Sequence, residues 1–286
     1  MQNVYPYQYD HMNMHYSCAF RIDSQAGNSD FHMHNLYEIY MLISGEIHYF
    51  VEQSCYHMTS GSLILFHDKE IHKATNLSDA PFERVTIHID PAFIHPYCTA
   101  QTNLLACFHR KTGQSNLVFL SEEEQKQFLY LAKILSQASK DGNYGQDILA
   151  LSVLLQILLL VNKAYFRGSS ASNSGPMPHR VQTLMNYVDN HLTEALSLDS
   201  ISKALSLDKY YLSHLFKSET GSSIFQYILV KRIALAKELL TKGYTVTESC
   251  HIAGFNDYSN FIRSFRQITG YTPGQFKKEA SKGIAL

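Results

Sequence analysis

The spacing of hydrophobic residues predicts two helices in the middle of the chain. Ser121 and Glu124 form a capping-box pattern, and apolar side chains then recur at helical spacing as far as about residue 139. The recurring positions are Phe128, Leu129, Leu131, Ile134 and Leu135. A second apolar segment, at 148–161, carries leucines around most of its circumference. We therefore expect this helix to be buried on more than one side, within its own domain or against a partner subunit.

On either side of these helices the pattern changes. We predict β-strands before them and further helices near the C-terminus. Residues 167–179, RGSSASNSGPMPH, are small and polar and include two prolines, so we expect a flexible linker there. The predicted class is α+β, with a β-rich domain at 1–120, a helical pair at 121–166, the linker, and an all-α domain at 180–286.

The C-terminal segment contains an internal repeat. When the segment is aligned with itself, the coinciding pairs are Ala204 with Ala253, Leu212 with Phe261, Phe216 with Phe265, Thr220 with Thr269, Gly221 with Gly270, and Tyr227 with Phe276. Each copy predicts a short helix, a tight turn and a second helix, which is the organisation of a helix-turn-helix unit. The predicted helix pairs are 198–205 with 208–219, and 246–253 with 256–268.

This C-terminal segment is also basic, although the whole chain has a formal net charge of −1. In its second predicted recognition helix, Phe261 and Phe265 face the core, while Arg263 and Arg266 lie on other faces. Arginine can bond bidentately to guanine, and an α-helix fits the major groove of DNA. We therefore predict that the polyanionic partner of this domain is double-stranded DNA.

The same residues carry a family resemblance. IAGFNDYSNFIRSFRQITGYTPGQFKK resembles the signature of the AraC/XylS family of bacterial transcription regulators, and SISKALSLDKYYLSHLFKSETG resembles the first helix-turn-helix unit of that family. The match covers about residues 180–278. It implies that two recognition helices enter successive major-groove segments, held apart by a long helix at 224–240. The implied base-contacting residues are Lys209, Tyr210, Ser213, His214, Tyr258, Ser259, Ile262 and Arg263.

The resemblance also implies phosphate contacts from Lys217 and Arg266, which would position the protein without specifying sequence. Two positions depart from the family pattern. Ser206 stands where the family has a glycine in the first turn, and His214 stands where arginine is frequent. Because a neutral imidazole offers one donor and one acceptor, we expect the first unit to read bases weakly or in a pH-sensitive way.

Two histidine-rich segments carry a second resemblance. FHMHNLYEIYMLISG at 31–45 and GSLILFHDKEIHKATN at 61–76 resemble the two motifs of the cupin β-barrel. If the first segment is one unbroken strand, His32, His34 and Glu38 point to the same face, because side chains alternate along a strand. In metal-binding cupins the corresponding ligands converge inside the barrel, and they match His32, His34, Glu38 and His72.

The resemblance to AraC-like regulators implies that this barrel holds a small organic effector. The second motif lacks its usual proline and glycine, with His67 and Lys69 in their places. We therefore prefer a hydrogen-bonding pocket to a divalent metal site and expect no cofactor. The expected effector-binding residues are His32, His34, Glu38, Tyr40 and His72. Aromatic residues of the same strands form either a pocket wall or plain sheet core.

Together these patterns predict a cytoplasmic, ligand-responsive transcription regulator that activates transcription, with RNA polymerase as a partner. We expect a homodimer joined through 148–161, a sugar or another small polar metabolite as effector, and no membrane association. Two alternatives stay open: a metal-dependent cupin enzyme fused to a DNA-binding module, and a metal or redox sensor that adds Cys55 to the histidines. The sequence has no nucleophile triad, phosphate-binding glycine loop or paired catalytic carboxylates, so we do not expect an enzyme.

Overall fold

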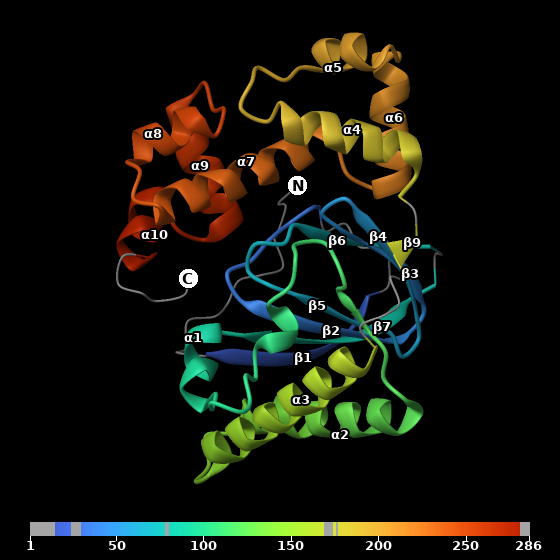
Figure 1. Cartoon of the computed structure of the whole chain (residues 1–286), viewed down its shortest axis with the longest axis vertical. Coiled ribbons are helices and arrows are strands. Elements are labelled where there is room, and N and C mark those ends of the chain that lie inside the picture. Colours follow the sequence, from blue (N-terminus) through green and yellow to red (C-terminus); the bar gives the residue numbers. More distant parts are fainter. Residues whose placement is uncertain (1–14, 24–29, 78–79, 169–173, 176, 281–286) are drawn as a thin grey trace.

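Two antiparallel sheets face each other at the centre of the molecule (Figure 1). The computed structural model describes residues 15–23, 30–77, 80–168, 174–175 and 177–280. One sheet has the strand order β1-β7-β2-β5-β8, and the other has the order β6-β3-β4-β9. The strands are β1 (Tyr16–Asp23), β2 (Tyr37–Ser44), β3 (Glu46–Val51), β4 (Ser54–Thr59), β5 (Leu63–Phe66), β6 (His72–Asn76), β7 (Phe82–Ile89), β8 (Leu117–Val118) and β9 (Ser174–Gly175). Between β7 and β8 lie α1 (Pro91–Ile94) and two 3-10 turns, η1 (His95–Tyr97) and η2 (Ala106–Phe108).

Alternation along the strands decides which side chains enter the barrel interior. In β2, Ile39 and Met41 pack outward, while Tyr40 and Leu42 pack inward against the facing sheet. Glu38 shares the inward parity. The strands therefore separate two apolar cores, one inside the barrel and one beneath its outer face. The predicted α+β class, with a barrel of two facing sheets, is confirmed.

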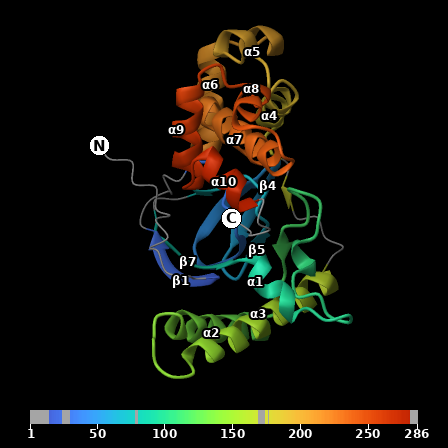
Figure 2. The same cartoon turned by 90° about the vertical axis from the view of Figure 1, so that its left-hand side faces the viewer.

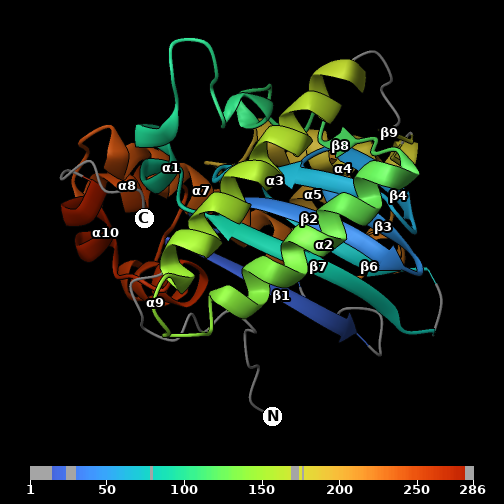
Figure 3. The ribbon, with the colours of Figure 1, turned by 90° about the horizontal axis from the view of Figure 1, so that it is seen from below.

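Helices α2 (Glu122–Ala138) and α3 (Gln146–Gly168) cover the outer face of the five-stranded sheet (Figure 3). The predicted capping box is present, because Ser121 and Glu124 exchange hydrogen bonds between side chain and backbone. Helix α3 is longer than predicted, and by length and composition it could cross a membrane. However, half of its apolar window is buried inside the structure, and it packs on α2, as is typical of a core helix.

The predicted linker at 167–179 lies partly outside the described residues. Helix α3 extends to Gly168, β9 pairs with β4, and the next helix begins at His179. Residues 169–173 and 176 are outside the described part of the chain. The flexibility of this segment therefore stays a prediction.

The helical domain lies on the opposite side of the barrel from α2 and α3 (Figure 2). Its helices are α4 (His179–Asn190), α5 (Leu198–Leu205), α6 (Lys209–Thr220), α7 (Ile224–Thr241), α8 (Val246–Ile252), α9 (Tyr258–Thr269) and α10 (Pro273–Ala280). Asp208 caps α6 and Asp257 caps α9, each by accepting bonds from two amides of the first turn. Gly221 and Gly270 end the same helices in the left-handed conformation. The two units thus share their start and stop signals, as the repeat predicts.

The turn between α5 and α6 forms without the glycine of the family pattern. Ser206 ends α5 in the left-handed conformation, with a φ of 54°. A side chain in this region costs about 1 kcal/mol relative to glycine. Serine at position 206 in place of glycine therefore strains the turn but does not prevent it from forming.

Candidate functional site

Helix α9 exposes a polar face beside its buried aromatic residues. Phe261 and Phe265 are fully buried in the helical domain. Among the residues of this helix that are predicted to contact DNA, the exposed ones are Tyr258, Ser259, Arg263 and Arg266. The Arg263 guanidinium donates a hydrogen bond to Asn260 Oδ1 at 3.2 Å. Ile262, by contrast, is partly buried against the domain core.

Helix α6 is built in the same way. Leu212 and Phe216 are buried. Among the residues of α6 that are predicted to contact DNA, the exposed ones are Tyr210, Ser213, His214 and Lys217. Lys209 differs from these because its Nζ lies 2.8 Å from Asp199 Oδ1 of α5. This pair is exposed, and such pairs contribute less than about 1 kcal/mol, so Lys209 can exchange Asp199 for an external anion. Both helices therefore present hydrogen-bonding groups that suit base edges and phosphates.

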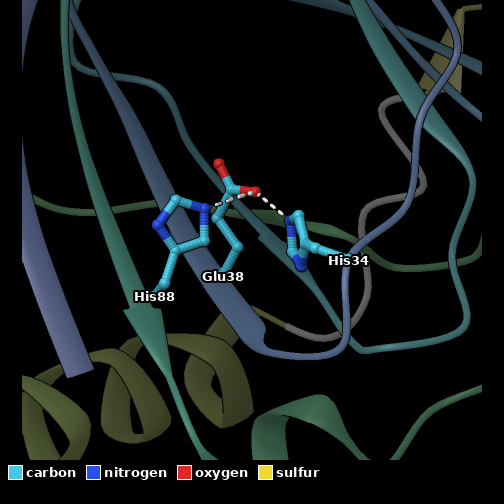
Figure 4. Close-up of side chains that lie close together, drawn as sticks. All are labelled: His34, Glu38 and His88. Carbon is cyan, nitrogen blue, oxygen red and sulfur yellow. Dashed lines mark hydrogen bonds and ion pairs between the residues drawn. The ribbon is translucent and has the colours of Figure 1, made fainter. Parts of the chain in front are cut away.

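A buried cluster of ionisable side chains lies inside the barrel. Figure 4 shows His34, Glu38 and His88 pointing toward one another. His34 precedes β2, Glu38 lies in β2, and His88 lies in β7 directly opposite Glu38 in the strand register. One ligand atom from each of these three residues lies within 4.8 Å of the others.

Glu38 Oε2 is the point at which the imidazoles meet. His34 Nε2 lies 2.6 Å from this oxygen, and His72 Nε2 and His88 Nε2 each lie 3.5 Å from it. Burial alone would raise the pKa of the Glu38 carboxyl, but the charge of His88 and hydrogen bonds from the imidazoles hold that pKa well below its usual range. The cluster therefore contains an ionised, buried carboxylate.

Backbone carbonyls orient two of the rings. His34 Nδ1–H donates to Leu36 O at 2.7 Å, and His72 Nδ1–H donates to Glu70 O at 2.9 Å. Nε2 of both rings therefore faces the carboxylate. Because Nδ1 already carries a proton, the short contact between His34 Nε2 and Glu38 Oε2 requires a second proton, shared between the ring and the carboxyl group.

Three of the four positions implied by the cupin resemblance come together, and His88 takes the place expected for His32. His32 instead packs edge-on against His72, with ring centroids 4.5 Å apart. The predicted alternation fails because the strand is broken: His32 forms an isolated bridge, and β2 begins only at Tyr37. Burial, followed by the neighbouring His72 and His34, lowers the pKa of His32 well below its usual range, so its ring is neutral.

The predicted effector residue Tyr40 belongs to a packed aromatic core. Its ring centroid lies 5.0 Å from that of Tyr49, which lies 4.9 Å from that of Phe66. Phe66 in turn stacks on His72 at 4.2 Å. All four residues are buried, so sheet core rather than a pocket wall is the arrangement observed. Two surface hollows, one in the loop between α2 and α3 and one around Phe108, include none of the cluster residues.

The four-stranded sheet packs against the helical domain and shares a hydrophobic core with it. The Phe31 ring lies 6.3 Å from Phe216 of α6 and 5.2 Å from Tyr227 of α7, centroid to centroid. Phe50 and Ile71 of the barrel belong to the same buried cluster as the core of the helical domain. The barrel therefore contacts the first recognition helix and the long connecting helix directly.

An ion-pair network borders this shared core. Lys231 Nζ of α7 lies 3.0 Å from Glu52 of the barrel and 3.2 Å from Asp189 of α4. Burial raises the pKa of Glu52, whereas it opposes the charge of Lys231, whose pKa is nevertheless raised by the two carboxylates. Gln53 Nε2 also donates to Asp189 at 3.0 Å. Sequence patterns gave no signal for this network, because each residue is ordinary by itself.

A second polar set holds the turn between α6 and α7. Ser222 Oγ donates to Asp30 Oδ1 at 2.6 Å and accepts from Lys73 Nζ at 3.4 Å. Thr75 Oγ1 donates to Thr220 O at 3.1 Å. Burial lowers the pKa of Lys73 to about 8. Hydrogen bonds thus join the C-terminal end of the first recognition helix to β6.

Two barrel segments carry cluster residues and interface residues in close succession. Asp30 and Phe31 contact the helical domain, and His34 of the same segment joins the cluster. In β6, His72 points into the barrel, whereas Lys73 contacts the helical domain. The cluster and the end of the first recognition helix are therefore linked through adjacent backbone.

Comparisons with known proteins match both parts of the chain. A model of the AraC-like ligand binding domain matches residues 15–158, and a model of a helix-turn-helix domain matches residues 201–279. The arabinose operon regulatory protein of Escherichia coli (strain K12) is 30% identical over 147 residues, covering 51% of this chain and 49% of that protein. The uncharacterized HTH-type transcriptional regulator YdeC of Bacillus subtilis (strain 168) is 23% identical over 254 residues, covering 86% and 85%.

Among solved structures, ToxT from Vibrio cholerae, with an unsaturated fatty acid bound, matches 97% of this chain and 99% of its own, at 14% identity and a TM-score of 0.43. The chain spans about half the length of the arabinose regulators that it matches. The ligand-binding model nevertheless covers half of this chain, and the helix-turn-helix model covers the repeated helices. The chain belongs to the AraC family of transcription regulators.

Proposed function

We propose that this protein is a sequence-specific DNA-binding regulator in which a ligand of the barrel changes how two DNA readers are presented. The observation that supports this most is the matched construction of α6 and α9, each with an exposed polar face. One chain then covers two major-groove segments about one helical turn apart. In this proposal Lys217 and Arg266 contact phosphates. The exposed base-contacting residues are Tyr210, Ser213 and His214 of α6 and Tyr258, Ser259 and Arg263 of α9.

Replacing Arg263 with alanine is expected to weaken binding to a selected DNA site by about 1–3 kcal/mol and to relax preference at one base position. Replacing Lys217 with alanine is the matched control. It is expected to weaken binding to all DNA sequences alike and to reduce the slope of log affinity against log salt concentration by about one, as for the loss of one phosphate contact. Titration of the selected site, its single-base variants and random DNA at several salt concentrations measures both effects. Equal loss on all sequences for both variants would assign Arg263 to a phosphate.

Ligand control acts, in this proposal, through the interface between the barrel and the helical domain. His72 and Lys73 are neighbours in β6. His72 contacts Glu38 of the cluster, whereas Lys73 donates a hydrogen bond to Ser222 in the turn after α6. A ligand that binds the cluster differently in two arrangements shifts their populations by its difference in affinity. The two arrangements are the first recognition helix docked on the barrel and the same helix undocked. Such a ligand favours one of them over the other.

The space around the cluster supports a proposal for the class of effector. The name of the Escherichia coli relative suggests a sugar, and we include sugars among the effectors to be tested. However, Tyr49 and Phe66 are at most 3% exposed and fill the barrel next to His72. A sugar in this position would have to displace them, so a smaller ligand fits the site better.

We further propose that the protein activates transcription together with RNA polymerase, as the family resemblance implies. A reporter gene placed downstream of the selected site is expected to show higher expression when the protein is present. Lower expression would instead identify a repressor that blocks the promoter.

We propose that two chains associate through α3. Ile148 is 65% exposed and Leu159 is 39% exposed, which is unusual for large apolar side chains of a helix that is otherwise half buried. The double variant Ile148→Glu/Leu159→Glu is expected to be monomeric by light scattering and to keep its circular dichroism spectrum. Leu155 packs partly on the domain core, so Leu155→Glu is the control that unfolds the domain. A double variant that stays dimeric would place the interface elsewhere.

A further inference from the structure

We propose that His34, Glu38 and His88 form a binding site for one first-row divalent transition-metal ion. The site itself stands on the geometry of the cluster. Only its regulatory role rests on the proposed function. Two imidazole nitrogens and one carboxylate oxygen are a donor set that suits Zn²⁺, Fe²⁺, Co²⁺ or Ni²⁺.

The spacing of the donor atoms matches such an ion. Two ligands at about 2.1 Å from a tetrahedral ion lie about 3.4 Å apart. His88 Nε2 lies 3.5 Å from Glu38 Oε2, and one ligand atom from each of His34, Glu38 and His88 lies within 4.8 Å of the others. His34 Nε2, at 2.6 Å from the same oxygen, is within hydrogen-bond distance, so the ion would replace one proton and move this ring by less than about 1 Å.

The surroundings of the rings favour coordination. Metal-bound histidines usually donate their other ring N–H to a carbonyl or carboxylate, which fixes the tautomer. His34 already makes such a bond, to Leu36 O at 2.7 Å. The backbone thus already fixes the His34 tautomer that directs Nε2 toward the ion.

The charge of the cluster and the limited space around it also favour a metal ion as the ligand. Among the described residues, no lysine or arginine forms an ion pair with Glu38, whose partners are the three imidazoles. A buried carboxylate needs a compensating cation or proton. The aromatic side chains beside His72 occupy the volume that an organic ligand would need, whereas an ion needs only the space among the three donor atoms. A metal ion therefore meets both requirements with little rearrangement.

The binding experiment uses the full-length protein without a polyhistidine tag, stripped with a chelator. Calorimetric titration with Zn²⁺, Co²⁺, Ni²⁺ and anaerobic Fe²⁺ is expected to show one ion per chain, and Mg²⁺ is expected not to bind. Bound Co²⁺ should give visible absorption bands typical of its coordination geometry. Glu38→Gln and His88→Gln are each expected to weaken binding at least tenfold.

A matched control is available on the barrel surface. His57 Nε2 lies 2.6 Å from Glu46 Oε1, the same spacing as in the cluster, but both side chains are about half exposed. His57→Gln is expected to leave metal binding unchanged. Thermal unfolding of every variant checks folding, and Glu38→Gln, which is nearly isosteric, keeps the test valid if His88→Gln fails to fold.

Wild-type protein that binds none of these ions more tightly than Glu38→Gln would overturn the proposal and identify the cluster as a hydrogen-bonded network only. The regulatory role is tested separately by DNA affinity of the stripped and metal-loaded protein. Metal binding with no change in DNA affinity would overturn that role but leave the site standing. Metal binding by a protein that selects no DNA sequence would contradict the proposed function but not the site.

Discussion

Replacing Lys231 with methionine is expected to loosen the helical domain from the barrel by about 3 kcal/mol. The Lys231 side chain is only 17% exposed and stands between Glu52 and Asp189, which are similarly buried. Without the ammonium group, two carboxylates face each other in a poorly solvated interface. The methionine retains the apolar stem, so the lost charge accounts for most of the effect.

Amide hydrogen exchange measures this loosening. We expect faster exchange at the turn after α6 and along β6, where the two domains meet, and unchanged exchange in α2 and α3. Lys242→Met is the matched control, because Lys242 pairs with Glu238 on the exposed surface of α7. If Lys231→Met and Lys242→Met gave the same exchange pattern, the ion-pair network would not contribute to domain docking.

Replacing Glu70 with alanine is expected to lower the free energy of unfolding by about 3–5 kcal/mol. Glu70 is fully buried, and its carboxylate accepts bonds from Arg110 Nη2 at 2.8 Å, Gly113 N at 2.7 Å and Asn116 Nδ2 at 3.1 Å. The alanine variant would leave the buried Arg110 guanidinium without its counter-charge. Glu70 also orients His72 through its backbone carbonyl, so this network supports the cluster.

Urea unfolding of the barrel, followed by circular dichroism, tests this expectation. Glu238→Ala removes one partner of an exposed carboxylate–ammonium pair and is expected to cost less than about 1 kcal/mol. Glu70→Gln, which keeps the shape and an acceptor, should fall between the two. A loss in Glu70→Ala no larger than that in Glu238→Ala would contradict the importance of the buried network.

The redox alternative raised by Cys55 is disfavoured by its surroundings. Cys55 is 6% exposed, and burial raises the pKa of its thiol to about 11. Reactive cysteines are usually accessible and carry a lowered pKa. Cys55 packs in the hydrophobic core shared by the two domains, so it serves packing rather than redox chemistry.

Local sequence signals were sufficient for the helical domain. Caps at Asp208 and Asp257 and glycines at the ends of α6 and α9 are read from neighbouring residues alone, because each acts within one turn of helix. The meeting of His34, Glu38 and His72 also followed from the motifs. These features depend on short segments whose geometry the sequence specifies directly.

Features that depend on long-range pairing were not predictable. His88 is a lone histidine in an apolar strand, and only the register between β2 and β7 places it opposite Glu38. The position expected for His32 was wrong because alternation does not continue through a broken strand. Likewise, the contacts of Lys231 and Lys73 depend on how two domains dock, for which no local pattern exists.

The central claim is that one chain carries two DNA readers, and selection of DNA from a random library by the full-length protein tests it most directly. The library should be sequenced after selection with wild-type protein and with Arg263→Ala. We expect wild-type protein to enrich two conserved segments about one helical turn apart, and Arg263→Ala to lose preference within one of them. Enrichment of a single segment, or of no sequence at all, would contradict the claim.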